Sequence, residues 1–262
     1  MAGFQYIKLS DFFAYTPTAT SSASGFPATN LSDWTNTRPL VRAWRSTGIT
    51  AQTITCAFSG AKNGNWMVLL NANFSQVQLA VSSDGTNFVD LITGSGTLTT
   101  YPIWQDARDP EGFYKLFISQ SYPGATHGRI IIPAQTPWTG EAYFKLGLLA
   151  WGNNIATMTQ YFHDPLGEEY VDPEYVAEGK DWEERNGAGI RYKTLSIHNR
   201  VPDAQRTEWH TLRLLMKAGA RVLGYHNQDD PSEVYIYSRN RSVTMTRHGT
   251  NQEIDTGLRT LS

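Results

Sequence analysis

Short apolar segments that alternate with polar residues dominate the first part of the chain, up to about residue 150. Successive side chains of a β-strand point to opposite faces, so such alternation predicts strands with one face turned inward. Gly, Ser, Thr, Asn and Pro are dense between the segments, as is typical of turns. We predict strands, in a number that suits a β-sandwich, at Ile49 to Phe58, Trp66 to Leu70, Val77 to Val81, Phe88 to Ile92, Tyr114 to Ser119, Gly128 to Ile132 and Ala142 to Leu149.

A polar segment, Ser82-Ser83-Asp84-Gly85-Thr86-Asn87, separates two of these predicted strands. Asp followed by Gly readily adopts the positive φ angles that a tight hairpin turn requires. We therefore predict a β-hairpin that turns at Asp84 and Gly85.

The pattern changes after about residue 150. The segment from Asp164 to Arg185 is acidic, is interrupted by Pro165 and Pro173, and has no sustained periodicity, which indicates a long loop or arm. Short strands separated by turn residues are predicted near the C-terminus, at Arg221 to Tyr225, Glu233 to Tyr237, Ser242 to Arg247 and Gln252 to Leu258.

One segment of the C-terminal part has the features of an amphipathic helix. Asp203 or Thr207 can cap its N-terminus, and Gly219 can end it. Its apolar residues fall on one broad face, namely Trp209, Leu212, Leu215 and Met216. The sequence thus predicts a mainly β protein with a sandwich over residues 1–150, followed over residues 151–262 by a smaller β domain with an acidic arm at 164–185 and one helix at about 207–218.

Length, charge and hydropathy exclude several classes of protein. With 262 residues the chain can form two domains. It carries 22 Lys and Arg against 24 Asp and Glu, without a long basic run, so we expect no nucleic-acid partner. No apolar stretch approaches the roughly 20 residues of a membrane span, and Met1 to Phe13 lacks the continuous apolar core of a signal peptide. We expect neither membrane insertion nor secretion through a signal peptide.

Residues that carry catalytic or metal chemistry occur without the spacing that such chemistry needs. The histidines form no i, i+4 pair, and the single cysteine, Cys56, lies in an alternating run where a buried side chain is expected. Glu168, Asp172 and Glu184 could serve acid/base catalysis, but a Pro-interrupted acidic segment is more typical of a solvated arm or a subunit contact. We therefore expect no enzyme, no cofactor and no metal.

Tryptophans in or beside the predicted loops are the candidate ligand residues. Trp34, Trp104 and Trp138 could stack on sugars or anchor a protein interface if their rings are exposed, and Trp151 lies in a similar place. Packing within the sandwich, or against a neighbouring subunit, is the alternative for each of these rings.

Three stretches of the N-terminal part resemble a known family, the discoidin-like or galactose-binding-like β-sandwich modules of phage tail and surface-recognition proteins. They are Phe26 to Asp33 (FPATNLSD), Trp44 to Gly48 (WRSTG) and Val77 to Phe88 (VQLAVSSDGTNF). The resemblance implies a jelly-roll sandwich, in which Trp44 is expected to anchor the core. Ligand sites of this family lie on variable loops at one end of the sandwich, so no ligand residue is carried over.

The whole chain, with its small C-terminal β domain, resembles distal tail and related tail-tip proteins. This resemblance implies a structural virion protein of a tailed phage, made in the host cytoplasm without a signal peptide and located in the tail. It implies a homo-oligomeric tail-tip or baseplate ring, which we expect to be a hexamer with a trimer as the alternative, and contacts with other tail proteins. A carbohydrate-binding module that recognises a host surface glycan is the alternative function, and a polysaccharide-degrading enzyme comes third.

Overall fold

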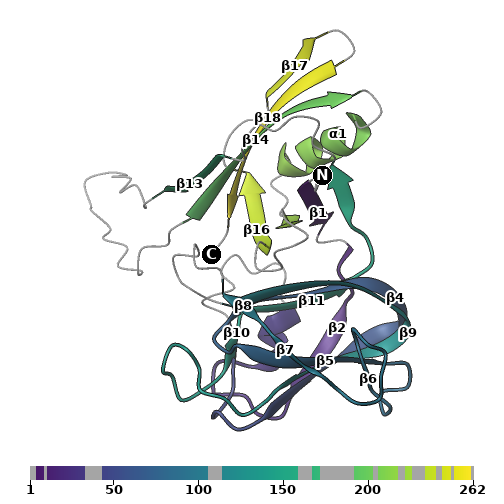
Figure 1. Cartoon of the computed structure of the whole chain (residues 1–262), viewed down its shortest axis with the longest axis vertical. Helices are drawn as coiled ribbons and strands as arrows, with labels where there is room; N and C mark the ends of the chain where they lie inside the picture. The colour runs from purple at the N-terminus through teal and green to yellow at the C-terminus, as the bar shows by residue number, and fades with distance from the viewer. Residues whose placement is uncertain are drawn as a thin grey trace. The chain divides into compact units, whose positions relative to one another are not determined.

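The computed structural model of the protein describes residues 4–8, 11–32, 43–105, 114–158, 167–171, 192–202, 206–217, 222–225, 234–239, 244–248 and 251–260 (Figure 1). The chain forms two compact units. Unit 1 comprises Met1–Tyr6, Ala156–His226 and Tyr235–Ser262, and unit 2 comprises Ile7–Ile155 and Asn227–Val234.

Unit 2 is organised around one long, bent pair of strands, β4 (Gln52–Ala72) and β9 (Tyr114–Ile132), which curve together in Figure 1. They pair antiparallel over most of their length, with register irregularities between Ala57 and Trp66 of β4. Irregularities of this kind bend a strand and increase its twist. The two halves of the pair therefore belong to two different layers.

Each layer recruits further strands on its own side of the bend. The first part of β4 pairs with β2 (Tyr15–Ala19), and the last part of β9 pairs with β5 (Gln76–Ser82). The last part of β4 pairs with β11 (Leu148–Gly152). The remaining elements are short: 3-10 helix η2 (Ala28–Ser32), β3 (Trp44–Arg45), β6 (Val89–Asp90), β7 (Thr100–Pro102), β8 (Trp104–Gln105) and β10 (Lys145–Leu146).

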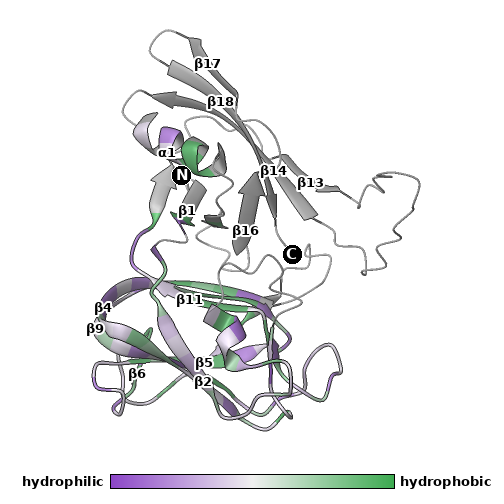
Figure 2. Ribbon diagram, turned by 180° about the vertical axis from the view of Figure 1, so that it is seen from behind, coloured by the Kyte–Doolittle hydropathy of each residue, from purple (hydrophilic) through white to green (hydrophobic). Residues whose placement is uncertain are grey.

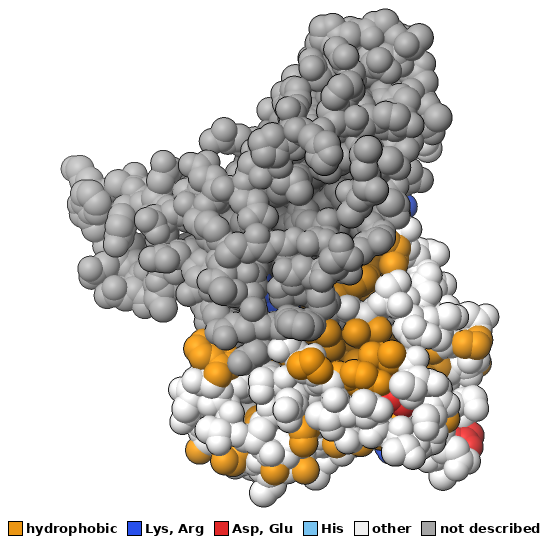
Figure 3. All heavy atoms as spheres, in the orientation of Figure 1, with side chains coloured by type: hydrophobic (Ala, Val, Ile, Leu, Met, Phe, Trp, Pro, Cys, Tyr) orange, Lys and Arg blue, Asp and Glu red, His pale blue; other side chains and the backbone are white. Residues whose placement is uncertain are grey.

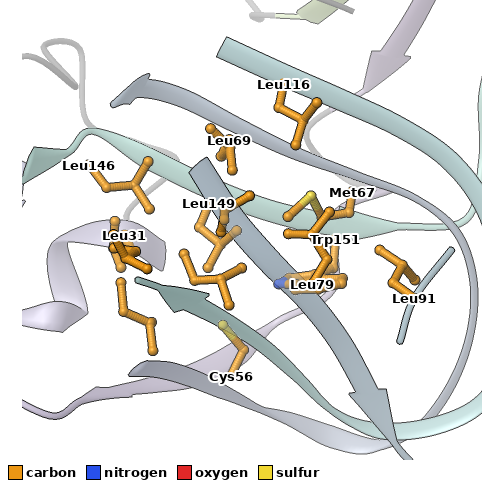
Figure 4. Close-up of a cluster of buried hydrophobic side chains, with 14 of the residues drawn as sticks. Leu31, Cys56, Met67, Leu69, Leu79, Leu91, Leu116, Leu146, Leu149 and Trp151 are labelled. Atoms are coloured by element: carbon orange, nitrogen blue, oxygen red, sulfur yellow. The ribbon is translucent and has the colours of Figure 1, made fainter. Parts of the chain in front are cut away.

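The two layers enclose one hydrophobic core (Figure 4). Apolar and polar residues are interspersed along the ribbons of unit 2, as Figure 2 shows, because alternate side chains point into the core and away from it. Trp44, as expected from the sequence, is fully buried. Trp151 lies near the end of β11, beside the loop that follows Gly152, and is also fully buried, in edge-to-face contact with Phe58 and Tyr122, so its ring packs within the sandwich, as the alternative for these tryptophans expected.

Tyr122 holds the bend of the long strand pair. Its hydroxyl donates a hydrogen bond to the carbonyl of Trp66 at 2.7 Å and accepts one from the backbone N–H of Gly152 at 3.1 Å. A Cβ atom at Gly64 would overlap the Tyr122 ring, so only glycine fits there. The side chain thus connects β9, β4 and β11 where they change layer.

The predicted strands of unit 2 are found in part, and the structure joins some of them. Phe88 to Ile92 is reduced to β6, and Ala142 to Leu149 is divided between β10 and the start of β11. The predictions Ile49 to Phe58 and Trp66 to Leu70 are both parts of β4, and Tyr114 to Ser119 and Gly128 to Ile132 are both parts of β9. The polar residues between them look like turns in the sequence, yet they stay paired across the bend.

The predicted tight turn at Asp84 and Gly85 is wrong in its length. β5 ends at Ser82 and β6 begins at Val89, so a longer loop connects the two strands. Gly85 does have the expected positive φ, of 79°.

Unit 1 contains a second sheet with the strand order β12-β1-β15-β16-β18-β14-β13, in which β17 also pairs with β18. Its strands are β1 (Phe4–Lys8), β12 (Ala156–Met158), β13 (Gly167–Val171), β14 (Tyr192–Pro202), β15 (Val222–Tyr225), β16 (Val234–Arg239), β17 (Thr244–His248) and β18 (Asn251–Thr260). β13 pairs with β14, so this part of the predicted acidic arm is a strand rather than a loop. The rest of the arm lies outside the described residues.

The predicted helix is α1 (Arg206–Lys217), within one residue of its expected position. Leu212 on its expected apolar face is buried, whereas Leu214 is 51% exposed. The predicted fold class, a mainly β chain with an N-terminal β-sandwich and a smaller β part with one helix, is confirmed. Within the described residues, no helix has the length and apolar character needed to cross a bilayer.

Candidate functional site

Four loops meet at the end of unit 2 where β2 stops and β5 begins. They are the loop after β2, the β3–β4 loop, the β4–β5 loop and the β9–β10 loop, and hydrogen bonds connect them. We call this region the loop end. The short pair β3–β10 lies within it and brings Arg45 opposite Lys145.

Asn73, which follows β4 and is fully buried, organises the loop end. Its side-chain Nδ2 donates to Glu141 Oε2 at 2.9 Å and to the Tyr143 carbonyl at 3.0 Å. Its Oδ1 accepts from the backbone N–H of Lys145 at 2.7 Å. One amide side chain thereby fixes three positions of the segment that leads into β10.

Glu141 is held as an ionised carboxylate. Burial alone would raise its pKa, but hydrogen bonds from Tyr143, Thr139 and Asn73, together with the positive charge of Lys145, lower the pKa below its ordinary value. The Tyr143 hydroxyl donates to Glu141 Oε1 at 2.7 Å. The loop end therefore presents a fixed negative charge with hydrogen-bond acceptor oxygens.

Trp138 is the exposed aromatic side chain of the loop end, with 42% of its surface accessible. Its backbone N–H donates to the Asn73 carbonyl at 3.2 Å. Gln135, three residues earlier, accepts hydrogen bonds from the backbone N–H groups of Ser75 and Gln76 and donates to the Gln76 carbonyl. These bonds attach the backbone that carries Trp138 to the start of β5.

Arg45 lies between two aromatic rings. Its guanidinium carbon is 3.8 Å from the centroid of the Phe26 ring and 5.1 Å from that of Tyr143. Its Nε atom is buried and has no hydrogen-bond partner. The neighbouring Trp44 is anchored below by a hydrogen bond from its indole N–H to the Ser21 carbonyl, at 3.0 Å.

The loop end thus combines an exposed indole ring, an ionised carboxylate and a cation held by two rings. Such a set can pack against the apolar face of a small polar molecule while binding its hydroxyl or charged groups. Among the described residues, no group of three or more His, Cys, Asp or Glu side chains is arranged to hold a metal ion.

The candidate tryptophans chosen from the sequence lie in different surroundings in the structure. Trp138 is exposed at the loop end, as a ligand residue would be. Trp104 lies in β8, where its backbone pairs with Lys115, and its side chain is outside the described part. Trp34 lies outside the described residues altogether. Of the acidic candidates, Glu168 is in β13, while Asp172 and Glu184 are not described.

Arg45, Asn73, Glu141 and Tyr143 were not selected from the sequence. They come from separate loops, and none of them belongs to a short pattern with a known chemistry. Arg45 is part of the stretch Trp44 to Gly48 that carries the family resemblance, and this was the available signal for its position near the core.

Two buried groups in unit 2 have structural rather than ligand-binding surroundings. The Asp90 carboxylate accepts hydrogen bonds from the backbone N–H groups of Ile92, Thr93 and Thr99 and from the Tyr101 hydroxyl. Cys56 is fully buried, as predicted, and burial raises the pKa of its thiol despite opposing hydrogen bonds.

No protein-family model matches the chain, and no curated protein matches it. Solved structures do match, and they cover about half of the chain. CpGH89CBM32-5 from Clostridium perfringens, in complex with GalNAc-beta-1,3-galactose, is 19% identical, with a TM-score of 0.37 over 56% of this chain and 99% of its own. Reduced XRCC1 bound to the DNA polymerase β catalytic domain is 11% identical, with a TM-score of 0.41 over 55% of this chain and 99% of its own. A His 62 mutant of the lectin binding domain of Lectinolysin, complexed with Lewis b, is 10% identical, with a TM-score of 0.41 over 54% of this chain and 94% of its own. Likeness at this level assigns neither a family nor a ligand to this chain.

Proposed function

We propose that this protein binds a carbohydrate at the loop end of unit 2. The observation that carries the proposal is the exposed ring of Trp138 on the same loop as the hydrogen-bonded Glu141 and Tyr143. A sugar ring has an apolar face of C–H groups and an edge of hydroxyl groups. An indole can pack against that face, while a carboxylate accepts hydrogen bonds from the hydroxyls.

The rigidity of the loop end supports the proposal. Gln135 and Asn73 attach the β9–β10 loop to the start of β5 and to the end of β4 through several hydrogen bonds. A loop that is already ordered loses less conformational entropy when a ligand binds. We propose that the chain acts as a binding protein and not as an enzyme, with Glu141 serving as a hydrogen-bond acceptor.

Carbohydrate binding was the alternative in our interpretation of the sequence, and it now takes first place. The tail-tip role, with its hexameric or trimeric ring, its tail-protein partners and its location in the virion, stays a prediction. Neither the described residues nor the comparisons support it. A sugar-binding unit is compatible with that role, because attachment to a host surface glycan needs such a unit.

A glycan array with the purified full-length protein tests the proposal, followed by titration calorimetry with the best sugar. We expect Trp138→Ala to weaken binding about tenfold or more, which corresponds to about 1.4 kcal/mol. Val89→Ala is the matched control, because Val89 is a similarly exposed apolar residue, 37% accessible, on β6, which pairs with the other end of β5. It should leave the affinity unchanged.

The proposal would be overturned if the array showed no bound glycan. It would also be overturned if Trp138→Ala bound the best sugar as tightly as the unmodified protein and the Val89→Ala control do.

A further inference from the structure

We infer that the sugar bound at the loop end is acidic and that Arg45 binds its carboxylate. The inference rests on the proposed function and deepens it, because it names the class of sugar and the residue that selects it. Three observations carry it: the hydrogen-bonding state of Arg45, the charges around it, and the way the two rings hold it.

The guanidinium of Arg45 has donors to spare. Its Nε is buried without a partner, and its terminal nitrogens make no hydrogen bond with the described residues. These terminal nitrogens are not among the buried atoms that lack a partner, and the residue as a whole is half-buried. A guanidinium presents its donors along its edge, in a geometry that matches the two oxygens of a carboxylate.

Phe26 and Tyr143 hold this group without using its donors. Both rings contact the guanidinium as cation–π partners, the nearer at 3.8 Å from the ring centroid. Such contacts restrict the orientation of the cation but leave its N–H edge unpaired. The side chain is therefore oriented before a ligand arrives, and its free edge is the part that can still form bonds.

The charges around Arg45 favour an anion. Lys145 lies directly opposite Arg45 in the β3–β10 pair, and like charges in that arrangement destabilise a strand pair. The described acidic group of the cluster, Glu141, is already bonded to Tyr143, Asn73 and Thr139 and is stabilised by Lys145. Figure 3 shows few charged side chains on the visible face of unit 2.

A purely structural role for Arg45 makes a different prediction. If the side chain only joins the loop after β2 to the β9–β10 loop through its two rings, the presence of a carboxylate on the sugar should not matter. The two roles are therefore distinguished by sugars that differ only in that group.

The test uses the full chain and two matched pairs of sugars: sialyllactose with lactose, and tri-galacturonate with its carboxyl-reduced form. Titration calorimetry at about 50 mM and 300 mM NaCl is expected to show at least one acidic sugar bound tenfold or more tightly than its neutral counterpart. The higher salt should reduce that preference. Arg45→Gln should abolish this preference, so that the acidic and the neutral sugar of a pair bind with equal affinity, and Arg45→Lys, which lacks the planar fork, should retain only part of the preference.

Equal affinity for the acidic and neutral member of both pairs would overturn the inference and leave the proposed function standing. A preference that survives in a folded Arg45→Gln variant would also overturn it. Failure of every sugar, both in these pairs and on the glycan array, would overturn the proposed function itself. The comparison of sugars on the unmodified protein needs no substitution, so it decides the question even if a variant fails to fold.

Discussion

The two ends of unit 2 each hold an ordered carboxylate in a polar loop, and they differ in what surrounds it. At the far end from the loop end, between β5 and β6, the exposed Asp84 accepts hydrogen bonds from the backbone N–H groups of Thr86 and Asn87 and from the side chains of Ser82 and Asn87. These bonds, first of all that from the Asn87 backbone, lower the pKa of Asp84. Its partners lie in its own loop or at Ser82, the last residue of β5, so these hydrogen bonds shape the turn.

At the loop end, Glu141 has partners from more than one segment, and it lies on the same loop as an exposed indole. The donors of Arg45 remain unused by the described residues. The comparison teaches that an ordered carboxylate alone does not mark a site. The loop end differs because it also holds an exposed indole ring and a guanidinium whose Nε has no hydrogen-bond partner.

The largest predicted effect is a loss of stability from a substitution in the core beneath the loop end. Trp44 is fully buried and bonds to the Ser21 carbonyl, so Trp44→Ala removes a large buried ring and leaves a cavity. We expect the free energy of unfolding to fall by about 3–5 kcal/mol, measured by urea unfolding. Trp138→Ala serves as the control, because removal of an exposed ring should cost less than about 1 kcal/mol. A loss below about 1 kcal/mol for Trp44→Ala would contradict the packing described.

The burial of Trp44 could be predicted from the sequence, because a large ring beside alternating strands belongs in a core. The length of β4 could not. Its residues 59–65 are polar and glycine-containing, and they stay extended only because they pair with β9, which lies far away in the sequence. Local pattern carries no information about such a partner.

Some residues of the candidate site could likewise be found from the sequence, and others could not. Trp138 could be found, because an aromatic residue in a polar segment is visible in the sequence. Arg45 could not, because its proximity to Phe26 and Tyr143 arises when β3 pairs with β10. Glu141 was missed because the acidic segment after residue 160 offered a denser group of carboxylates, while the bonds from Asn73 that set Glu141 apart exist only in the folded chain.

An intermediate effect is expected from Asp90, which is buried and bonded like the carboxylate at the far end. Burial would raise its pKa, but its hydrogen bonds from Thr93, Thr99, Tyr101 and Ile92 outweigh burial and lower the pKa. Asp90→Asn places amide N–H groups against backbone donors, so we expect a loss of about 1–3 kcal/mol at pH 7. Val89→Ala, next to it and exposed, should cost little.

The pH dependence sharpens this prediction. Because the folded-state pKa of Asp90 is below the unfolded value of about 4, its contribution is fully present above that value and is lost as the pH falls through the folded-state pKa. The difference in unfolding free energy between Asp90→Asn and the unmodified protein, measured by urea unfolding, should therefore shrink at acid pH. A difference independent of pH from 7 to 3 would show that the carboxylate charge is not what stabilises the loop.

The smallest effect separates the two ends directly, through the same carboxylate-to-amide change at each. Glu141→Gln removes an anionic acceptor at the loop end, and we expect affinity for the best neutral sugar to fall about fivefold, or about 1 kcal/mol. Asp84→Asn makes the matching change at the far end and should leave that affinity unchanged, because the partners of Asp84 lie in its own loop and at Ser82, away from the loop end. For an acidic sugar, the loss with Glu141→Gln should be smaller, since the substitution also removes a like charge. Calorimetry on the two variants measures all three values, and equal losses from Glu141→Gln and Asp84→Asn would show that the ligand does not distinguish the two ends.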